Sequence, residues 1–549
     1  MVEQPNPVIF YHPDAYRVDR KDLKGRHSAG DSFLTAFLDH ADGPDVYALC
    51  VGKDSGSEFK QRVRASRRPL KAQTLSRANV ESLRRQALVY LPHPEIANEA
   101  KIRSFLGDTS YALTGVAHTI ASLEMLGSIA DLSVAPVQPW DALICTSRAV
   151  HEAVTKLIDG VEYGLRARLG ATRFVRPLLP VIPLGIHSER FRRNDTDRQQ
   201  WRQRLGIADD AFVILFFGRL SVHAKAAPFQ LAQAAELASA DVERPLVVVW
   251  CGWFNDEFQS RVFTSTAKAM APSVPFYFVD GRDEQTRFSV WSAADAFCSL
   301  SDNIQESFGL TVIEAMAAGL PVVASNWNGY REAVEHGVNG FLIDSYLSPG
   351  SLAAAGYRYI GREDTYDRYI GALSQLAFVN LAQTAQALTK LANDESLCAG
   401  LADAARKTIA ERFDWKVVMP HYVALWSEQT ARLDRQRQQS AVTSMPRQSL
   451  DAAYTFSGFP SRQLRGSSVL GQGVQFSRWS ELIKQPGIVV NPAVLTGRRQ
   501  IGTLHELFGD GRPRDMDEIV KNFSENEVAA IVRTLHWLIK IGLLELVSA

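Results

Sequence analysis

The sequence has few cysteines, no excess of charge of either sign and no long apolar run. Its 549 residues include only five cysteines, and neither a disulfide framework nor the paired spacing of a zinc site fits their scatter. They are Cys50, Cys145, Cys251, Cys298 and Cys398. Lysine plus arginine and aspartate plus glutamate both number 60, so the whole chain has no field that would draw it to nucleic acid. The longest apolar runs are too short to span a membrane and no signal segment is visible, so we expect a cytoplasmic protein.

What is present is an ordinary globular composition, with 46% apolar and 22% charged residues. The length predicts two or three packed domains. The clearest strand signals are the short apolar runs 212–217 and 246–250, and residues 229–240 between them have helical spacing. Further runs follow at 276–279, 296–300 and 321–324. Strands that alternate with helices predict a doubly wound parallel sheet.

Weaker runs of the same kind occur in the first half of the chain, at 46–51, 87–91, 142–146 and 181–182. They predict a second α/β domain. The polar stretch 186–210 separates the two series, so we expect one Rossmann-like domain over 1–200 and another over 201–430. Because parallel sheets present ligands at the carboxyl ends of their strands, the active site is expected in the cleft between the domains.

The composition changes after residue 430. Residues 431–466, rich in Gln, Ser, Arg and Pro, predict a linker, and 467–549 a small, mainly helical unit. Ser524 and Glu527 fit a capping box before an apolar helix that ends near Gly542, and 542–547 could be a strand. A winged-helix-like module is the expectation. Its charges nearly balance, which favours a protein partner or an oligomer contact over nucleic acid.

The most informative segment is ESFGLTVIEAMAAG at 306–319. Ser307 suits a helix N-cap, and Gly319 suits the helix end. The free N–H groups and the positive end of such a helix can hold a phosphate, while Glu306 reaches for hydroxyls. Glu314 would lie about 10 Å away. The two carboxylates could therefore hold both ends of one nucleotide sugar.

The seven residues between Glu306 and Glu314 resemble the signature of retaining glycosyltransferases of family four, the glycosyl transferases group 1 with the GT-B fold. FFGRLSVHAK at 216–225 resembles the family's glycine–arginine and lysine motif, and 318–343 resembles its sugar-binding segment. Weaker similarities occur at 115–122, 144–150, 181–186 and 411–426. The resemblance covers roughly residues 8–430. It implies two doubly wound Rossmann-like domains that face each other across a cleft.

The resemblance also implies an activity, a hexosyltransferase of class EC 2.4 that keeps the anomeric configuration. The donor would be a nucleotide diphosphate sugar of UDP or GDP type, and the acceptor a carbohydrate, a lipid-linked molecule or a protein. Front-face attack with the leaving phosphate as base is the family's favoured mechanism. No metal and no further cofactor are implied.

Site residues follow from the same resemblance. Arg219 and Lys225 are implied to bind the donor diphosphate, where a guanidinium beside an ammonium stabilises the charge that develops on the leaving group. His118 is implied at the reacting face of the sugar, Glu306 at the sugar hydroxyls and Glu314 at the ribose. Gly30, in a loop, would pass close to the phosphates, and 280–282 would lie near the base. The full set of other implied donor-binding residues is Gly30, Gly218, Asp280, Gly281, Arg282, Ser307, Phe308, Gly309, Leu310 and Thr311.

Other interpretations stay open. Taken singly, Glu306 could be a helix cap and His118 a structural histidine. A catalytically degenerate protein of this fold could only bind a nucleotide or a partner. The stretch 53–85 is rich in Lys and Arg; it is either a solvated face or a site for a phosphate-bearing acceptor or for peripheral contact with the inner face of a membrane. An insertion at 345–373 with four tyrosines could be a lid, an acceptor wall or a subunit contact.

Overall fold

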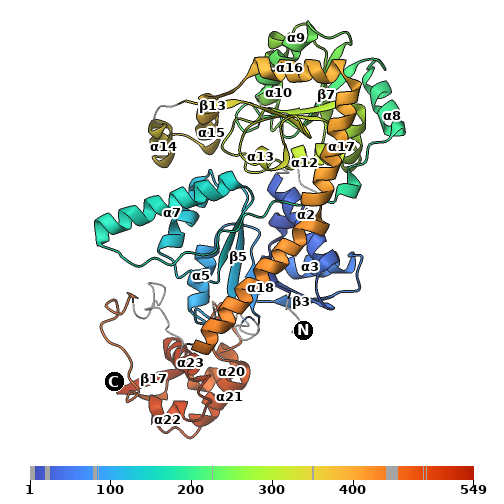
Figure 1. The fold of residues 1–549 in the computed structure, drawn as a ribbon. Helices are drawn as coiled ribbons and strands as arrows, with labels where there is room; N and C mark the ends of the chain where they lie inside the picture. The colour runs from blue at the N-terminus through green and yellow to red at the C-terminus, as the bar shows by residue number, and fades with distance from the viewer. Residues whose placement is uncertain are drawn as a thin grey trace. The chain divides into compact units, whose positions relative to one another are not determined.

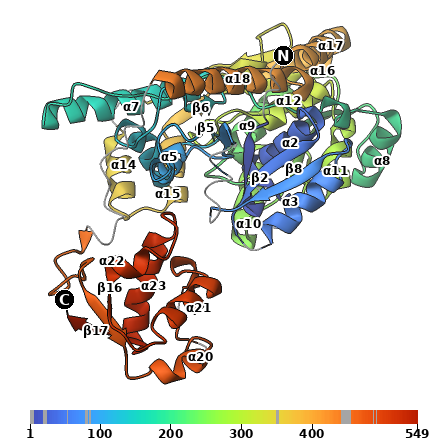
Figure 2. The same cartoon turned by 90° about the horizontal axis from the view of Figure 1, so that it is seen from below.

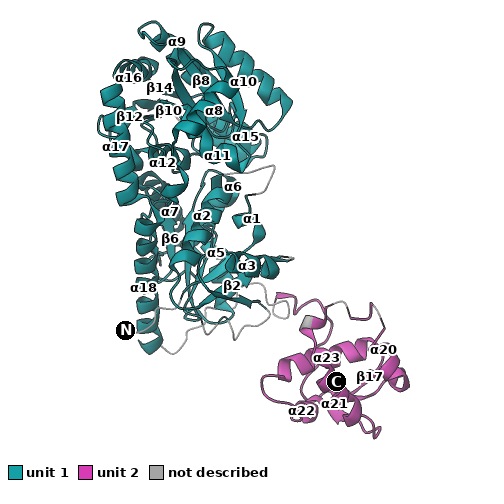
Figure 3. Cartoon of the chain, turned by 90° about the vertical axis from the view of Figure 1, so that its right-hand side faces the viewer, with its two compact units in different colours: residues 1–445 teal, residues 446–549 magenta. Residues whose placement is uncertain are grey.

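The computed structural model describes residues 6–18, 25–52, 54–77, 83, 86–225, 227–348, 352–439, 455–485, 487–489 and 491–548. The chain divides into two compact units, residues 1–445 and 446–549 (Figure 3). The larger unit contains two α/β domains (Figure 1). No helix within the described ranges is long and apolar enough to cross a membrane.

The first domain is built on a six-stranded parallel sheet in the order β3-β2-β1-β4-β5-β6. The strands are β1 Val8–Tyr11, β2 Asp45–Cys50, β3 Lys71–Leu75, β4 Leu88–Tyr90, β5 Ala112–Ala117 and β6 Ala142–Cys145. The helices are α1 Pro13–Tyr16, α2 Gly25–His40, α3 Ser55–Arg64, α5 Ile96–Ser104, α6 Leu123–Ala130 and α7 Arg148–Leu169. Separate hydrophobic cores fill the two faces of the sheet, so β4, β5 and β6 are buried throughout.

The second domain repeats this plan, in the order β12-β11-β10-β7-β8-β9. The strands are β7 Phe212–Phe217, β8 Leu246–Gly252, β9 Phe276–Asp280, β10 Ala296–Ser299, β11 Val322–Ser325 and β12 Gly340–Ile343. The main helices are α8 Asp195–Leu205, α9 Pro228–Ser239, α10 Glu257–Met270, α11 Glu284–Ser289, α12 Leu310–Ala317, α16 Leu381–Asn393 and α17 Glu395–Arg412. Counted from its own first strand, each sheet has the doubly wound order 3-2-1-4-5-6. The predicted fold of two Rossmann-like domains is confirmed.

The long helix α18, Trp415–Gln439, leaves the second domain and runs along the first, beside α2 and β5 (Figures 1 and 2). Its Trp415, Tyr422, Trp426 and Leu433 are buried in the first domain's core. The predicted start of the linker at residue 431 is therefore wrong, because the apolar face of the helix continues to Leu433. Of the remaining predicted linker, 440–454 lies outside the described residues.

The smaller unit is a three-stranded antiparallel sheet packed with helices around its own core. The strands, in the order β16-β15-β17, are β15 Val469–Gln472, β16 Arg514–Asp515 and β17 Leu544–Ser548. The helices are α20 Trp479–Leu482, α21 Arg498–Leu507, α22 Met516–Val520 and α23 Val528–Lys540. The Ser524 hydroxyl donates to Glu527 before α23, and Gly542 with φ +75° follows its end. The predicted helical unit with a closing strand is confirmed.

The described part of the predicted basic stretch forms α3 and β3, while 53, 78–82 and 84–85 lie outside the described residues. Two of its arginines are paired within the domain, Arg62 with Asp31 and Arg77 with Glu99. Part of the positive charge is thus committed to internal ion pairs.

Candidate functional site

The strand order places one point in each sheet where neighbouring connections run in opposite directions. In the second domain that point lies between β7 and β10, and loops that leave such strands open a crevice at the carboxyl edge. The loop after β7 carries Arg219 and Lys225, and the loop after β10 carries Glu306. Topology alone thus brings Arg219 and Lys225 together with Glu306, which lies 81 positions beyond Lys225 in the sequence.

Lys225 and Glu306 form an ion pair, with Nζ 2.7 Å from Oε2. The Glu306 side chain is only 10% exposed, whereas that of Lys225 is 31% exposed. The Glu306 backbone carbonyl accepts a hydrogen bond of 2.7 Å from Asn328 Nδ2. A buried carboxylate needs a charged partner, and the Lys225 ammonium provides one for Glu306. Because Lys225 is the more exposed of the two, the ion pair lies at the surface of the crevice.

Arg219 lies on the same loop with a neutral partner. Its Nη2 donates to Gln305 Oε1 over 2.9 Å, and burial lowers the pKa of the guanidinium while Asp367 and Tyr366 oppose that shift. A guanidinium remains protonated even so. Its charge is therefore held in place next to the Lys225–Glu306 pair.

The helix of the central motif begins later than predicted. Gly309, whose φ of +100° is not helical, is the N-cap, and Leu310 and Thr311 start α12. A Cβ at 309 would come within 2.2 Å of the Tyr330 ring, which explains the glycine. Ser307 is therefore not the cap; its carbonyl accepts from Ser147 Oγ of the first domain over 3.1 Å. Phe308 is buried in the second domain's core.

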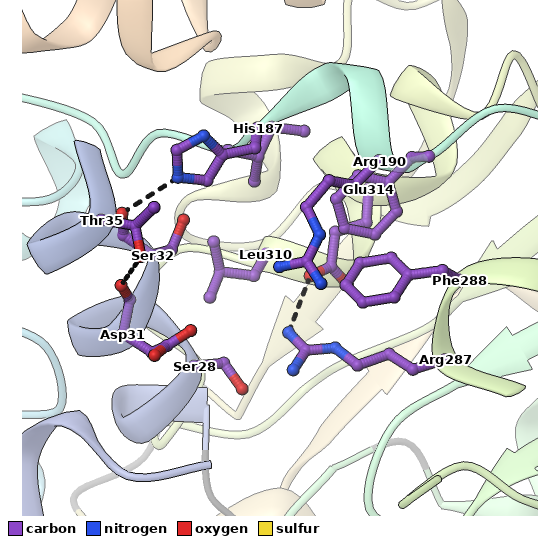
Figure 4. A pocket seen from close by; sticks show the side chains of 12 residues that line it. Ser28, Asp31, Ser32, Thr35, His187, Arg190, Arg287, Phe288, Leu310 and Glu314 are labelled. Atoms are coloured by element: carbon purple, nitrogen blue, oxygen red, sulfur yellow. Dashed lines mark hydrogen bonds and ion pairs between the residues drawn. The ribbon is translucent and has the colours of Figure 1, made fainter. Parts of the chain in front are cut away.

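Glu314 lines a pocket with residues of both domains (Figure 4). The α2 side chains Ser28, Asp31, Ser32 and Thr35 lie on one side, and Arg287, Phe288 and Glu314 on the other. Burial raises the pKa of Glu314, and Arg287, with Nη2 3.7 Å from Oε1, opposes the rise. The pocket presents hydroxyl acceptors and donors from one domain and an ion pair from the other.

His118 follows β5 at the carboxyl edge of the first sheet. Burial, together with the positive Arg26 and the imidazole of His93, lowers the pKa of His118 to about 4. The pKa of His93, which follows β4, is also lowered to about 4, mainly by burial. Both imidazoles are neutral near pH 7, so each can donate one hydrogen bond and accept another.

Gly30 lies in α2 and not in a loop, which corrects the predicted local structure. A Cβ there would come within 2.1 Å of the Ala15 carbonyl oxygen, so the close contact of α2 with α1 explains the glycine. The implied role at the phosphates is not needed to account for it.

The other predicted glycines and residues 280–282 lie at the carboxyl ends of strands in the second sheet. Gly218 has φ +154°, and a Cβ on Gly252 would come within 1.8 Å of the carbonyl oxygen of Gly218. Asp280 ends the edge strand β9 and pairs with Arg282 just after it, with Arg282 Nη2 2.5 Å from Asp280 Oδ2. Gly281 packs against Cys251. Strand β8 separates these residues from the loop of Arg219 and Lys225.

Sequence reasoning missed four polar side chains at the site: Ser147, Arg287, Gln305 and Asn328. Ser147 Oγ is 2.9 Å from Asn328 Oδ1 and joins the two domains beside Glu306. Asn328 has φ +41°, a left-handed conformation that asparagine tolerates, and it lies within the segment that resembles the family's sugar-binding stretch. Over the described ranges no group of three or more His, Cys, Asp or Glu could hold a metal.

Comparison with known proteins agrees with this geometry. Residues 197–372 match the family model described as glycosyl transferases group 1. D-inositol 3-phosphate glycosyltransferases are similar: that of Geodermatophilus obscurus is 33% identical over 202 residues, 35% of this chain and 44% of the relative. That of Corynebacterium jeikeium is 30% identical over 233 residues, 42% of this chain and 54% of the relative. The chain thus matches about half the length of these relatives.

The fold is similar to that of Anabaena HepE, crystallised in complex with UDP. The superposition has a TM-score of 0.50 at 19% sequence identity and covers 77% of this chain and 99% of HepE. At this identity the likeness shows the fold. The class defined by fold and family match is therefore a GT-B structure whose second domain resembles the glycosyl transferases of group 1.

Proposed function

We propose that this protein transfers a hexose from a nucleoside diphosphate sugar to an acceptor with retention of configuration. The observation that carries the proposal is the convergence of Arg219, Lys225 and Glu306 at the switch point of the second sheet. Ligands of doubly wound sheets bind at that point.

The charges suit a sugar diphosphate. Breaking the bond between sugar and phosphate builds negative charge on the leaving group, and Arg219 and Lys225 supply two cations for it. Without a donor, Lys225 neutralises Glu306. A bound diphosphate would compete for the ammonium and release carboxylate oxygens of Glu306 for the sugar hydroxyls. The first turn of α12 adds free N–H groups at residues 309–311.

The pocket around Glu314 supports the nucleoside end of the same ligand. A largely buried carboxylate can accept hydrogen bonds from ribose hydroxyls, and Arg287 opposes the rise in the pKa of Glu314 that burial causes. From the first domain, the neutral imidazole of His118 would donate a hydrogen bond to a hydroxyl of the sugar or accept one from it. The leaving phosphate would act as base in front-face attack. The UDP complex of HepE supports a uridine donor, and the named acceptor of the relatives, an inositol phosphate, supports a polar acceptor.

The test measures binding and turnover on purified wild-type protein. UDP, GDP and ADP are titrated by calorimetry, and the sugar nucleotides of the best binder are offered with simple sugars and inositol phosphates as acceptors. We expect one nucleotide to bind selectively and NMR of the product to show the donor's anomeric configuration. Selective binding without any turnover would instead support a degenerate, binding-only protein. An inverted product would contradict retention, and no binding by any nucleotide would overturn the whole proposal.

A further inference from the structure

The insertion at 345–373 builds a helical hairpin at the donor crevice. Strands β13 Ser345–Leu347 and β14 Ala377–Val379 pair antiparallel at its base, and α14 Ala353–Ile360 packs beside α15 Tyr366–Ser374 (Figure 1). Tyr359 of α14 stacks on Tyr369 of α15, with ring centroids 4.4 Å apart and planes 12° from parallel. The aromatic stack makes the two helices one body.

One side of this hairpin is bonded to the loop of Arg219. Tyr366 OH accepts from Gln305 Nε2 over 3.1 Å, and Gln305 Oε1 accepts from Arg219 Nη2 over 2.9 Å. The amide of Gln305 therefore has both ends committed, one to the hairpin and one to the guanidinium. Rotating the amide would place an N–H against the guanidinium, so Arg219 decides which end of the amide faces it. The hydrogen bond to the Tyr366 hydroxyl holds the other end of the amide in place.

A second, buried contact holds the hairpin in register with the same loops. Asn303 Nδ2 donates to the His223 carbonyl over 2.6 Å and to the Ile370 carbonyl of α15 over 3.3 Å. The Asn303 Oδ1 accepts from the backbone N–H of Gln305 over 2.9 Å. The position of Gln305 along the chain is thus set by a residue that also binds α15.

The choice of partner leaves the charge of Arg219 available. Lys225 is neutralised by Glu306, but Arg219 is bonded to a neutral amide and, among the residues that the structure describes, forms no ion pair. A carboxylate in place of Gln305 would compete with an anionic ligand. The amide fixes the direction of the guanidinium without neutralising it.

The opposite side of the hairpin touches the first domain. The backbone N–H of Leu123, at the start of α6, donates to Tyr359 OH over 3.2 Å. Leu123 follows His118 by five residues. The hairpin thus spans from the Arg219 loop to the segment that carries His118.

We propose that Tyr366 is a positioning residue for Arg219, acting through Gln305, so that the α14–α15 hairpin is a working part of the diphosphate site. This inference rests on the proposed function and deepens it, because it assigns the insertion to recognition of the donor's phosphates.

The test compares Tyr366→Phe with Tyr369→Phe. Both changes remove one hydroxyl from α15, and within the described chain Tyr369 makes a ring contact but no hydrogen bond through that hydroxyl. Affinities for UDP, GDP, their parent nucleosides and inorganic pyrophosphate are measured on the full chain by calorimetry. Loss of one neutral hydrogen bond corresponds to about a five- to tenfold change in an equilibrium constant.

We expect Tyr366→Phe to weaken the nucleoside diphosphate and pyrophosphate about five- to tenfold and to leave the nucleoside unchanged. Tyr369→Phe should stay within about twofold of wild type on all ligands. Gln305→Glu, which pairs Arg219 with a carboxylate, should weaken the diphosphates more than Tyr366→Phe does.

Four outcomes contradict the assignment. If both tyrosine variants behave alike, or if nucleoside and diphosphate weaken equally in Tyr366→Phe, the hairpin has only a structural role and the proposed function stands. If Gln305→Glu binds diphosphates as wild type does, Arg219 does not act through that residue. If wild type binds neither nucleotides nor pyrophosphate, the proposed function and this inference fail together.

Discussion

The two α/β domains share one strand order but carry different chemistry at the same topological edge. In the second domain the switch-point loops carry two cations, each with a partner: Lys225 pairs with the carboxylate of Glu306, and Arg219 with the neutral amide of Gln305. In the first domain the corresponding edge holds His93 and His118, both with a lowered pKa. A common backbone therefore supports two paired cations at the edge of one sheet and two uncharged imidazoles at the edge of the other.

The difference follows from what each edge must stabilise. Cations that are to bind an anion need partners that hold them in place without fully neutralising them. The second domain provides a carboxylate for one cation and an amide for the other. The imidazoles of His93 and His118, whose pKa values are lowered to about 4, carry no charge near pH 7 and can offer directional hydrogen bonds only. The comparison predicts that charge changes matter in the second domain and packing changes in the first.

The largest effect is expected from Lys225→Ala. Removing one of the two cations at the leaving group should lower donor turnover by about 10²–10³-fold, the usual result of removing one electrostatic stabiliser of a transition state. The measurement is the initial rate of nucleotide release from the sugar nucleotide. Lys156→Ala is the control, since Lys156 is an exposed lysine paired with Glu152 on α7, and its rate should stay within about twofold of wild type. Wild-type turnover in Lys225→Ala would refute the charged-edge interpretation.

Gly30→Ala should break the packing of the first domain. The new Cβ would sit 2.1 Å from the Ala15 carbonyl oxygen, so we expect a loss of about 1–3 kcal/mol in the free energy of unfolding, measured by urea denaturation. The matched control is Gly160→Ala in α7, where no atom lies within 4 Å of the added Cβ and a small gain in stability is expected. Unchanged stability with weakened nucleotide binding would restore the implied phosphate role of Gly30.

Glu314→Gln should weaken nucleoside diphosphate binding about tenfold, because a hydrogen bond to a charged acceptor becomes a neutral one. The loss should be smaller for the 2′,3′-dideoxy nucleotide, which lacks the hydroxyls that Glu314 is proposed to bind. Calorimetry with both nucleotides gives the two ratios. Glu152→Gln, a change at an exposed partner of Lys156 on α7, serves as control. Equal losses for both nucleotides would place Glu314 away from the ribose.

Local pattern was enough to predict five of the six strands of the second sheet and its charged loops. Runs 212–217 and 246–250 are β7 and part of β8 because they are continuous, apolar and bounded by glycine or polar residues. The first sheet was only partly predictable, because its strands β1, β3 and β5 gave no apolar run that stood out. In the second sheet the same was true of β12. Strand β3 is an edge strand with mostly exposed and half-exposed residues, so burial leaves no apolar pattern in its sequence.

The partners of the site residues could not be predicted, because they come from distant segments. Ser147 reaches Asn328 across the two domains, and Tyr366 reaches Gln305 from the helical hairpin of 345–373. Residue spacing cannot show such contacts. The same holds for Gly30, whose neighbour Ala15 is brought close by a short helix that no periodicity reveals.

The smallest effect should be seen at His118, and it concerns pH. Its folded pKa of about 4 lies below the ordinary 6.5, so the folded state binds the proton less readily than the unfolded chain. This histidine therefore contributes stability that is present above pH 6.5 and is lost as the pH falls toward 4. NMR titration of the imidazoles, assigned by His118→Gln, should show that the His118 imidazole is neutral at pH 6.5. The rate should then have no inflection near 6.5 from this group. An inflection there that disappears in His118→Gln would mean that the first domain's edge carries a charge after all, and the contrast between the two edges would fall.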